Sequence, residues 1–202
     1  MNKLQNKNII IFGATGLIGS QLSFSFASQG ANLILHGKSN LKLKTLNDKI
    51  EKEFNKPVLL ECDIMSENFY LDILKVVSSR FNHIDIMINL IGKFDGLKPL
   101  TDLSHREWNE LMEVNFNCYW RILKELSPLL GKKNKSKIIF LNNRLIQSGK
   151  AYHNILSISK GALSSLAQTL NLEKKKFGIE LQLIETPELL AGVTKPLAVE
   201  GG

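Results

Sequence analysis

The sequence predicts a doubly wound α/β domain in three layers, with a parallel sheet of about seven strands between two helical layers. Three observations carry this prediction. Short apolar runs alternate with longer amphipathic segments, as in successive βαβ units. The short runs are continuously apolar, which is typical of parallel strands buried on both faces. A glycine-rich turn directly follows the first of these runs.

Each element follows from its own residue pattern. The segment 41–54, for example, has apolar residues at Leu43, Leu46, Ile50 and Phe54, which is helical spacing. Gly30 is suited to end the first helix. No repeat, linker or second domain is evident, so residues 1–202 are expected to form one domain. The expected strands are 8–12, 31–35, 58–62, 84–91, 137–141 and 179–184, and the expected helices are 16–29, 41–54, 69–81, 104–130 and 155–176.

The composition narrows the class of protein. The formal net charge of +7 comes largely from two lysine runs, within 132–137 and 174–176, which we interpret as a solvated surface. We therefore expect no nucleic-acid or membrane partner. Cys62 and Cys118 lie far apart, and the four histidines lack metal-ligand spacing, so no metal site is expected. The polar segment 1–8 does not resemble a signal peptide, and a cytoplasmic location is the default expectation.

The first expected strand runs into a glycine turn that precedes a helix. Glycines in such a turn allow a tight bend, a close approach of the backbone to a pyrophosphate, and close packing of helix on strand. The helix N-terminus then offers free N–H groups to phosphate. This context predicts a Rossmann-type dinucleotide site, and the alternative is that Gly16 and Gly19 only permit close packing. The expected cofactor-binding residues of the turn are Gly13, Thr15, Gly16, Leu17, Ile18 and Gly19.

The end of the second expected strand bears on which dinucleotide is bound. A carboxylate there would accept hydrogen bonds from the ribose 2′-OH of NAD. This chain has His36, Gly37, Lys38 and Ser39 instead, and Lys38 could pair with a 2′-phosphate. We therefore prefer NADP(H), with NAD(H) possible. The alternative is that Lys38 only opens a solvated loop.

Further motifs appear in a fixed order along the chain. Asp63 follows the third strand, Asn89 and Gly92 bracket the end of the fourth, and Asn115 follows a tryptophan on the long helix. A Ser-Lys-Gly-Ala-Leu run contains Lys160, and the chain closes on 195–202, whose last residues are Val-Glu-Gly-Gly. Taken together, these motifs resemble the short-chain dehydrogenase/reductase family over nearly the whole chain.

The resemblance implies roles for the matching residues. In it, Lys160 is the active-site lysine that also holds the cofactor ribose, and Asn115 supports the active-site helix and a proton-relay water. Asp63 would contact the adenine, and 195–202 would form the last strand. The cofactor-binding residues that it implies outside the glycine turn are Asp63, Ile64, Asn89, Gly92 and Lys160.

Other positions depart from the family pattern. The family's catalytic tyrosine precedes the lysine by four residues, and here that residue is Leu156, which cannot transfer a proton. The nearest tyrosine, Tyr152, could reach the site only if its segment folds back. The family's catalytic serine corresponds to Asn143, which could polarise a carbonyl or be an ordinary turn residue. The family's substrate lid and the helix after the sixth strand are expected to be deleted, and Leu17 replaces a family glycine.

These features leave three functional hypotheses. The first is an NAD(P)(H)-dependent oxidoreductase acting on a carbonyl or alcohol, with weakened catalysis that uses Lys160, Asn115 and Asn143. The alternative is a catalytically silent dinucleotide-binding subunit or sensor. A nucleic-acid-binding module is supported only by the net charge. A homo-oligomer is expected, because the family usually pairs through the two long helices. Residues compatible with such pairing, or with burial in the domain's own core, are Leu111, Ile122, Leu126, Ile158 and Leu166.

Overall fold

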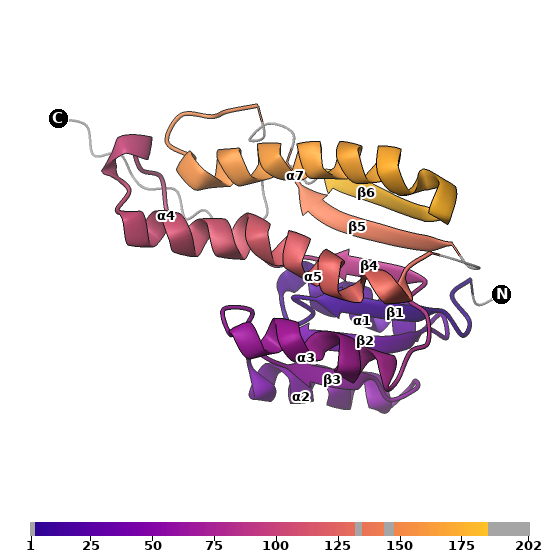
Figure 1. Cartoon of the computed structure of the whole chain (residues 1–202). Helices are drawn as coiled ribbons and strands as arrows, with labels where there is room; N and C mark the ends of the chain where they lie inside the picture. Colours follow the sequence, from indigo (N-terminus) through magenta and orange to yellow (C-terminus); the bar gives the residue numbers. More distant parts are fainter. Residues whose placement is uncertain (1–2, 132–134, 144–147, 186–202) are drawn as a thin grey trace.

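A computed structural model describes residues 3–131, 135–143 and 148–185. Their strands form one parallel sheet in the order β3-β2-β1-β4-β5-β6 (Figure 1). The predicted doubly wound fold is confirmed, with six strands in the described part of the chain. The predicted last strand, 195–202, lies outside the described residues. The strands are β1 (Asn8–Phe12), β2 (Asn32–Gly37), β3 (Val58–Glu61), β4 (Ile86–Asn89), β5 (Ser136–Asn142) and β6 (Ile179–Glu185).

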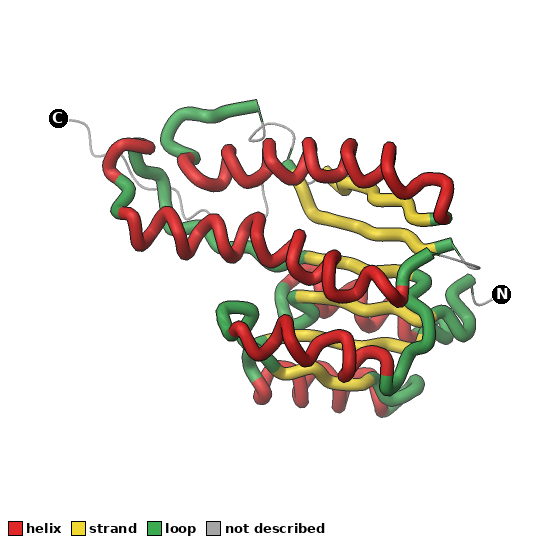
Figure 2. The backbone as a smooth tube through the Cα atoms, in the orientation of Figure 1, coloured by secondary structure: helices red, strands yellow, loops and turns green. Residues whose placement is uncertain are grey.

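Helices cover both faces of this sheet, as Figure 2 shows. The π-helical turn Glu113–Asn117 interrupts the predicted long helix 104–130, which also finishes in a 3-10 turn where Pro128 removes a backbone donor. Helix α1 ends at Ala27, and the Gly30 amide donates to its last carbonyl at 3.0 Å. The helices are α1 (Leu17–Ala27), α2 (Asn40–Glu51), α3 (Glu67–Ser78), α4 (His105–Met112), α5 (Cys118–Leu126) and α7 (Asn154–Lys174).

The side chains of β1 alternate between two apolar cores. Ile9 and Ile11 pack into the core that is shared with α1 and α2, where Leu43 and Ile50 are buried. Ile10 and Phe12 face the opposite core, which is built with α3, α5 and α7. These four side chains are fully buried, as expected of a strand covered on both faces.

The strand order reverses between β1 and β4. β1 pairs with β2 on one side and with β4 on the other, all in parallel. The connections that leave these two strands therefore diverge at the carboxyl edge of the sheet and open a crevice there. In a doubly wound sheet this crevice is where ligands bind. The glycine turn leaves β1 at this point.

Candidate functional site

The glycine turn requires glycine at two positions for different reasons. Gly13 has a φ of +76°, and a Cβ there would lie 3.3 Å from the backbone of Leu90 and Ile91 on the β4 connection. At Gly19, a Cβ would lie 2.3 Å from the carbonyl oxygen of Gly13. The absence of a side chain at Gly19 therefore lets the start of α1 pack against the turn.

The first turn of α1 is open to an anion. Gly16 is its N-cap residue, and no described side chain caps it. The first turn contains no acidic residue, and Leu17 is 61% exposed at its start. Free N–H groups and the positive end of the helix dipole therefore face the crevice, as a pyrophosphate site requires.

A methyl group added at Gly19 should disrupt this packing. We expect Gly19→Ala to lower the free energy of unfolding by about 1–3 kcal/mol, because the backbone of the turn must move to admit the Cβ. The matched control is Gly16→Ala, where the Cβ would lie 3.4 Å from the nearest atom, an ordinary contact. Urea denaturation of both variants measures the difference, and equal losses in the two would contradict the close approach at Gly19.

At the end of β2, the histidine and the lysine have different surroundings. His36 is buried between the rings of Phe12 and Phe69, and its Nε2 lies 3.1 Å from the carbonyl oxygen of Cys62. Burial lowers the pKa of His36 to about 4, so the ring is neutral at physiological pH. Lys38 is exposed, at the carboxyl edge of the sheet. Lys38 is therefore the residue of this segment that could meet a ligand phosphate.

A groove lies beside the turn, between α1 and α2, with a volume of about 670 Å³. Thr15 lines it, and the Thr15 hydroxyl also borders Gly37, at 3.1 Å from the place where a Cβ would stand. Lys42 and Lys49 line the groove from α2, whose first turn carries no acidic side chain. The surroundings of Thr15 and Lys38 are thus rich in cations.

The residues expected to hold the adenine follow β3. Asp63 is exposed, and its Oδ1 accepts a hydrogen bond from the Met65 amide at 3.0 Å. Ile64 is buried in the core together with α3, so only its backbone could meet a cofactor. Asp63 keeps an exposed carboxylate at the edge of the crevice.

At the end of β4, Asn115 holds the connection that follows the strand. Its Oδ1 accepts from the Lys93 amide at 2.9 Å, and its Nδ2 donates to the Lys93 carbonyl at 2.8 Å. Gly92 lies directly beside this amide group. The side chain of Asn89 is buried and accepts from the Ile91 amide at 3.0 Å. The π-helical turn places Asn115 where it fixes this backbone, so the structure adds a specific anchoring contact to the role expected of Asn115.

Lys160 lies on α7 beside the end of β5. Its Nζ donates to the Leu141 carbonyl at 2.8 Å and lies 5.9 Å from the centre of the Tyr119 ring. Burial lowers the pKa of Lys160 to about 8, which makes this amine easier to deprotonate than an exposed lysine. Tyr119 was missed by the sequence analysis. Its ring is fully buried, and its hydroxyl donates to the Ile91 carbonyl.

The two positions expected to correspond to the family's catalytic tyrosine and serine, Leu156 and Asn143, lie within the described residues. Leu156 is half-buried, and it precedes Lys160 by four residues in continuous helix, so the two share a face. Asn143 is buried immediately after β5. Tyr152 lies before α7 with 60% of its surface exposed, and its carbonyl accepts from the Lys98 amide at 3.0 Å. The segment of Tyr152 therefore does fold back toward the β4 connection, while its ring remains on the surface.

Ion pairs tie the outer part of the β4–α4 connection to α4. Lys93 pairs with Glu110 at 2.6 Å and with Asp95 at 3.3 Å, and Lys98 pairs with Glu107 at 2.7 Å. Hydrogen bonds from Lys98 and from Ser104, the N-cap residue of α4, lower the pKa of Glu107 to about 2. The wall of the crevice is thus held by charge pairs as well as by Asn115.

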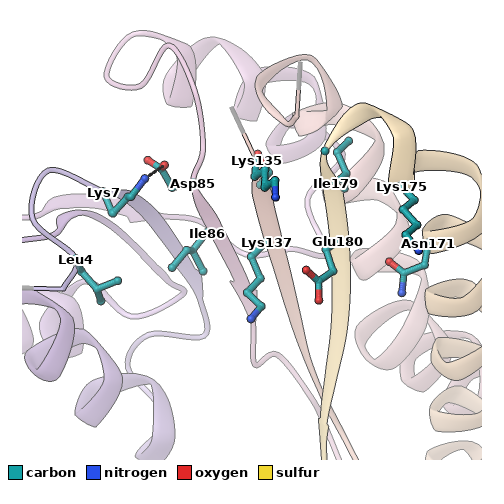
Figure 3. A pocket seen from close by; sticks show the side chains of 12 residues that line it. Leu4, Lys7, Asp85, Ile86, Lys135, Lys137, Asn171, Lys175, Ile179 and Glu180 are labelled. Carbon is teal, nitrogen blue, oxygen red and sulfur yellow. Dashed lines mark hydrogen bonds and ion pairs between the residues drawn. The ribbon is translucent and has the colours of Figure 1, made fainter. Parts of the chain in front are cut away.

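A second cavity, of about 620 Å³, lies at the amino edge of the sheet. Figure 3 shows Lys135, Lys137 and Lys175 around it, together with the ion pair between Lys7 and Asp85. Lys135 and Lys137 of one lysine run therefore line the same cavity as Lys175 of the other. The cavity lies at the end of the strands opposite to the glycine turn, so it is separate from the crevice.

The described residues provide neither a cluster of metal ligands nor a helix that could span a membrane. No group of histidine, cysteine, aspartate and glutamate side chains in 3–131, 135–143 and 148–185 could hold a metal ion. Within the same ranges, no helix combines the length and the apolar character needed to cross a bilayer.

Comparison with known proteins identifies relatives along most of the chain. The family model described as short chain dehydrogenase matches residues 7–199. An uncharacterized oxidoreductase of Staphylococcus epidermidis is 25% identical over 193 residues, covering 93% of this chain and 82% of the relative. The L-fucose dehydrogenase of Oryctolagus cuniculus is 23% identical over 192 residues, covering 95% of this chain and 66% of the relative.

Solved structures share the fold. A short chain dehydrogenase of Shigella flexneri complexed with NADP superposes with a TM-score of 0.85 at 22% identity, covering 92% of this chain and 79% of that one. An NADH-dependent reductase complexed with NAD superposes with a TM-score of 0.81 at 21% identity, covering 91% of this chain and 79% of that one. These neighbours include complexes with both dinucleotides.

Proposed function

Because the chain belongs to the short-chain dehydrogenase family, we propose that it binds NADP(H) and interconverts a small carbonyl compound and its alcohol. The observation that carries this proposal is the glycine turn against the open first turn of α1. Gly13 and Gly19 leave no room for side chains, and the uncapped helix end faces the crevice at the strand reversal. This arrangement fits a pyrophosphate.

The preference for NADP(H) rests on charge. Lys38 is exposed at the end of β2, and Lys42 lines the adjoining groove beside Thr15. The NADP complex of the Shigella flexneri protein accords with this preference, and the NAD complex of the reductase keeps NAD(H) as the second cofactor to test.

Reversing one charge should change the preference between dinucleotides. We expect Lys38→Glu to weaken NADPH binding about 10- to 100-fold, since a carboxylate would repel the 2′-phosphate and favour an unmodified ribose. NADH binding should hold or improve. Fluorescence titration of both dinucleotides measures the ratio, with Lys49→Glu, farther along the same groove, as the matched charge control. Parallel losses for NADPH and NADH in Lys38→Glu would contradict the proposed contact.

The other residues of the proposed site would bind the cofactor ribose, position the β4 connection and contact the substrate carbonyl. The nicotinamide supplies or accepts the hydride when the cofactor is bound. Lys160, held by the Leu141 carbonyl, is placed to bind the cofactor ribose, and Asn115 keeps the β4 connection in position. Asn143 can donate a hydrogen bond to a substrate carbonyl.

Catalysis in this chain is proposed to be weaker than in relatives that have a tyrosine at the position of Leu156. Leu156 shares the face of Lys160 and offers no proton. Loss of a general acid typically costs 10²- to 10⁴-fold in rate.

The test combines binding with turnover. NADPH and NADH are titrated against the purified chain, and NADPH oxidation is then followed with a panel of aldehydes and ketones. We expect binding of NADPH in the micromolar range together with slow turnover. Failure of both dinucleotides to bind at millimolar concentration would overturn the proposal. Binding without any turnover would leave the silent dinucleotide-binding subunit as the function.

We further propose a small-molecule substrate, a homo-oligomeric assembly and a cytoplasmic location. Ile158 on α7 and Trp120 on α5 are exposed, at 37% and 49%, and could meet a second copy. Leu111, Ile122 and Leu126, by contrast, are buried in the domain's own core, and Leu166 packs against it. The free thiols of Cys62 and Cys118 suit a reducing compartment.

A further inference from the structure

His153 is the N-cap residue of α7, seven residues before Lys160. Residues at i, i+3 and i+7 of a helix share one face, so His153, Leu156 and Lys160 form a single row. All three side chains are half-buried, whereas Ile155, Ser159 and Leu163 on the adjacent face are buried. The row therefore has an imidazole at one end, an amine at the other and an apolar side chain between them.

The backbone around His153 is strained. Among the described non-glycine residues, Asn6, Tyr152 and Asn154 have a positive φ, and the last two flank His153. Their φ values are 65° and 33°. Such a conformation is uncommon for asparagine and an outlier for tyrosine, and strain of this kind gathers at functional sites.

Hydrogen bonds hold this corner in place. The Tyr152 carbonyl accepts from the Lys98 amide at 3.0 Å, and the His153 amide donates to the Lys150 carbonyl at 3.1 Å. The Asn154 Oδ1 accepts from the Ile155 amide at 2.6 Å. Hydrogen bonds thus connect the segment 150–154 both to the β4–α4 connection and to the first turn of α7.

The ring of His153 has a defined orientation. Its Nδ1 lies 2.9 Å from the Ala151 carbonyl oxygen, which can only accept, so Nδ1 carries the hydrogen of this bond. Nε2 is left as the exchangeable position. The ring centre also lies 6.2 Å from that of Phe94, on the loop directly after Gly92 and Lys93. The β4 connection and the residue that caps α7 therefore meet at this imidazole.

We propose that His153 is the proton donor and acceptor of this site, in place of the missing tyrosine. The inference rests on the proposed oxidoreductase function. In reduction, a hydride from NADPH adds to the carbonyl carbon, and the π pair moves to the oxygen. That oxygen takes the proton from Nε2 of the imidazolium, which leaves neutral imidazole to regain a proton from water. The helical rise from His153 to Lys160, over seven residues, is about 10 Å. The side chain of Lys160 spans part of this distance, because helical side chains lean toward the N-terminus. A small carbonyl compound then lies over Leu156.

The first test replaces the imidazole. We expect His153→Gln to lower the turnover of carbonyl reduction at least 10²-fold without changing the affinity for NADPH. His105→Gln is the matched control, since His105 is the exposed first residue of α4, and Tyr152→Phe tests the neighbouring hydroxyl. Both controls should stay within about twofold of the unmodified protein. Free imidazole added to His153→Ala should restore part of the activity.

A second measurement does not depend on turnover. In protein labelled with ¹⁵N-histidine, and with His153→Gln used for assignment, NADP⁺ together with an unreactive alcohol should shift the Nε2 resonance of His153 and leave that of His105 in place. Wild-type turnover in His153→Gln, or an unmoved resonance, would overturn the role of His153. NADPH binding without turnover by the unmodified chain would also overturn it while leaving cofactor binding intact. Failure to bind NADPH would instead remove the proposed function itself.

Discussion

Restoring the family's two polar groups should raise turnover about 10²-fold. The change is Leu156→Tyr together with Asn143→Ser. A tyrosine at position 156 stands one helical turn from Lys160, closer to the lysine than any imidazole at position 153, and the lysine lowers the pKa of a phenol beside it. The site for the new ring exists, because Leu156 is half-buried on the face that it shares with Lys160.

The measurement is NADPH oxidation across the same carbonyl panel. The matched control is Ile158→Tyr, which places an equal ring at an exposed position of α7 and should not change the rate. If the double variant gained no activity while it bound NADPH as tightly as the parent, Leu156 would not stand at the reaction centre. The weakened-catalysis part of the proposal would then be wrong.

Removing the amine of Lys160 should make the fold more stable at neutral pH and abolish its rise in stability with pH. Burial lowers the pKa of Lys160 to about 8, against about 10.5 in the unfolded chain. Between these values the unfolded state binds more protons, so the stability of the natural chain rises as pH increases from 8 to 10.5. This pKa difference corresponds to a rise of about 3 kcal/mol in the free energy of unfolding over that pH range. Lys160→Met should lack this rise.

Urea denaturation of Lys160→Met and of the natural chain at pH 7, 9 and 10.5 tests this expectation. Lys124→Met, on the exposed side of α5, provides the control for loss of a lysine charge. The same Lys160→Met protein should bind NADPH less tightly, because the ribose loses its donor. A variant that is less stable than the parent at pH 7 would show that the bond to the Leu141 carbonyl outweighs the burial of the charge.

The fold could be predicted from the sequence because local patterns determine it. The uninterrupted apolar runs of β1 and β2 indicate strands buried on both faces, and the glycine turn marks the strand-to-helix connection that begins the doubly wound order. The long helix 104–130 was predicted as continuous because its apolar period is regular. The π-helical turn at Glu113–Asn117 contains Asn115, whose contacts with Lys93 are not revealed by any periodicity of the sequence.

The candidate site was predictable only in part. The spacing from Lys160 located Leu156, since helix geometry alone puts them on one face. The burial of Lys160, and with it the lowered pKa, requires knowing that the amine meets the Leu141 carbonyl of β5. The contacts of Tyr119 and His153 were not predicted, because they join segments distant in sequence, the β4 connection with α5 and the β4 connection with α7.

The contacts that hold the β4–α4 connection differ in their sensitivity to ionic strength. The outer ones are ion pairs of half-exposed side chains, Lys93 with Glu110 and Lys98 with Glu107, and counterions screen such pairs at high ionic strength. The inner contact is formed by the neutral side-chain amide of Asn115, whose hydrogen bonds to the Lys93 backbone are not weakened by counterion screening. Concentrated salt should therefore weaken the attachment of the β4–α4 connection to α4 through these ion pairs, while the bonds between Asn115 and Lys93 keep the start of the connection in place.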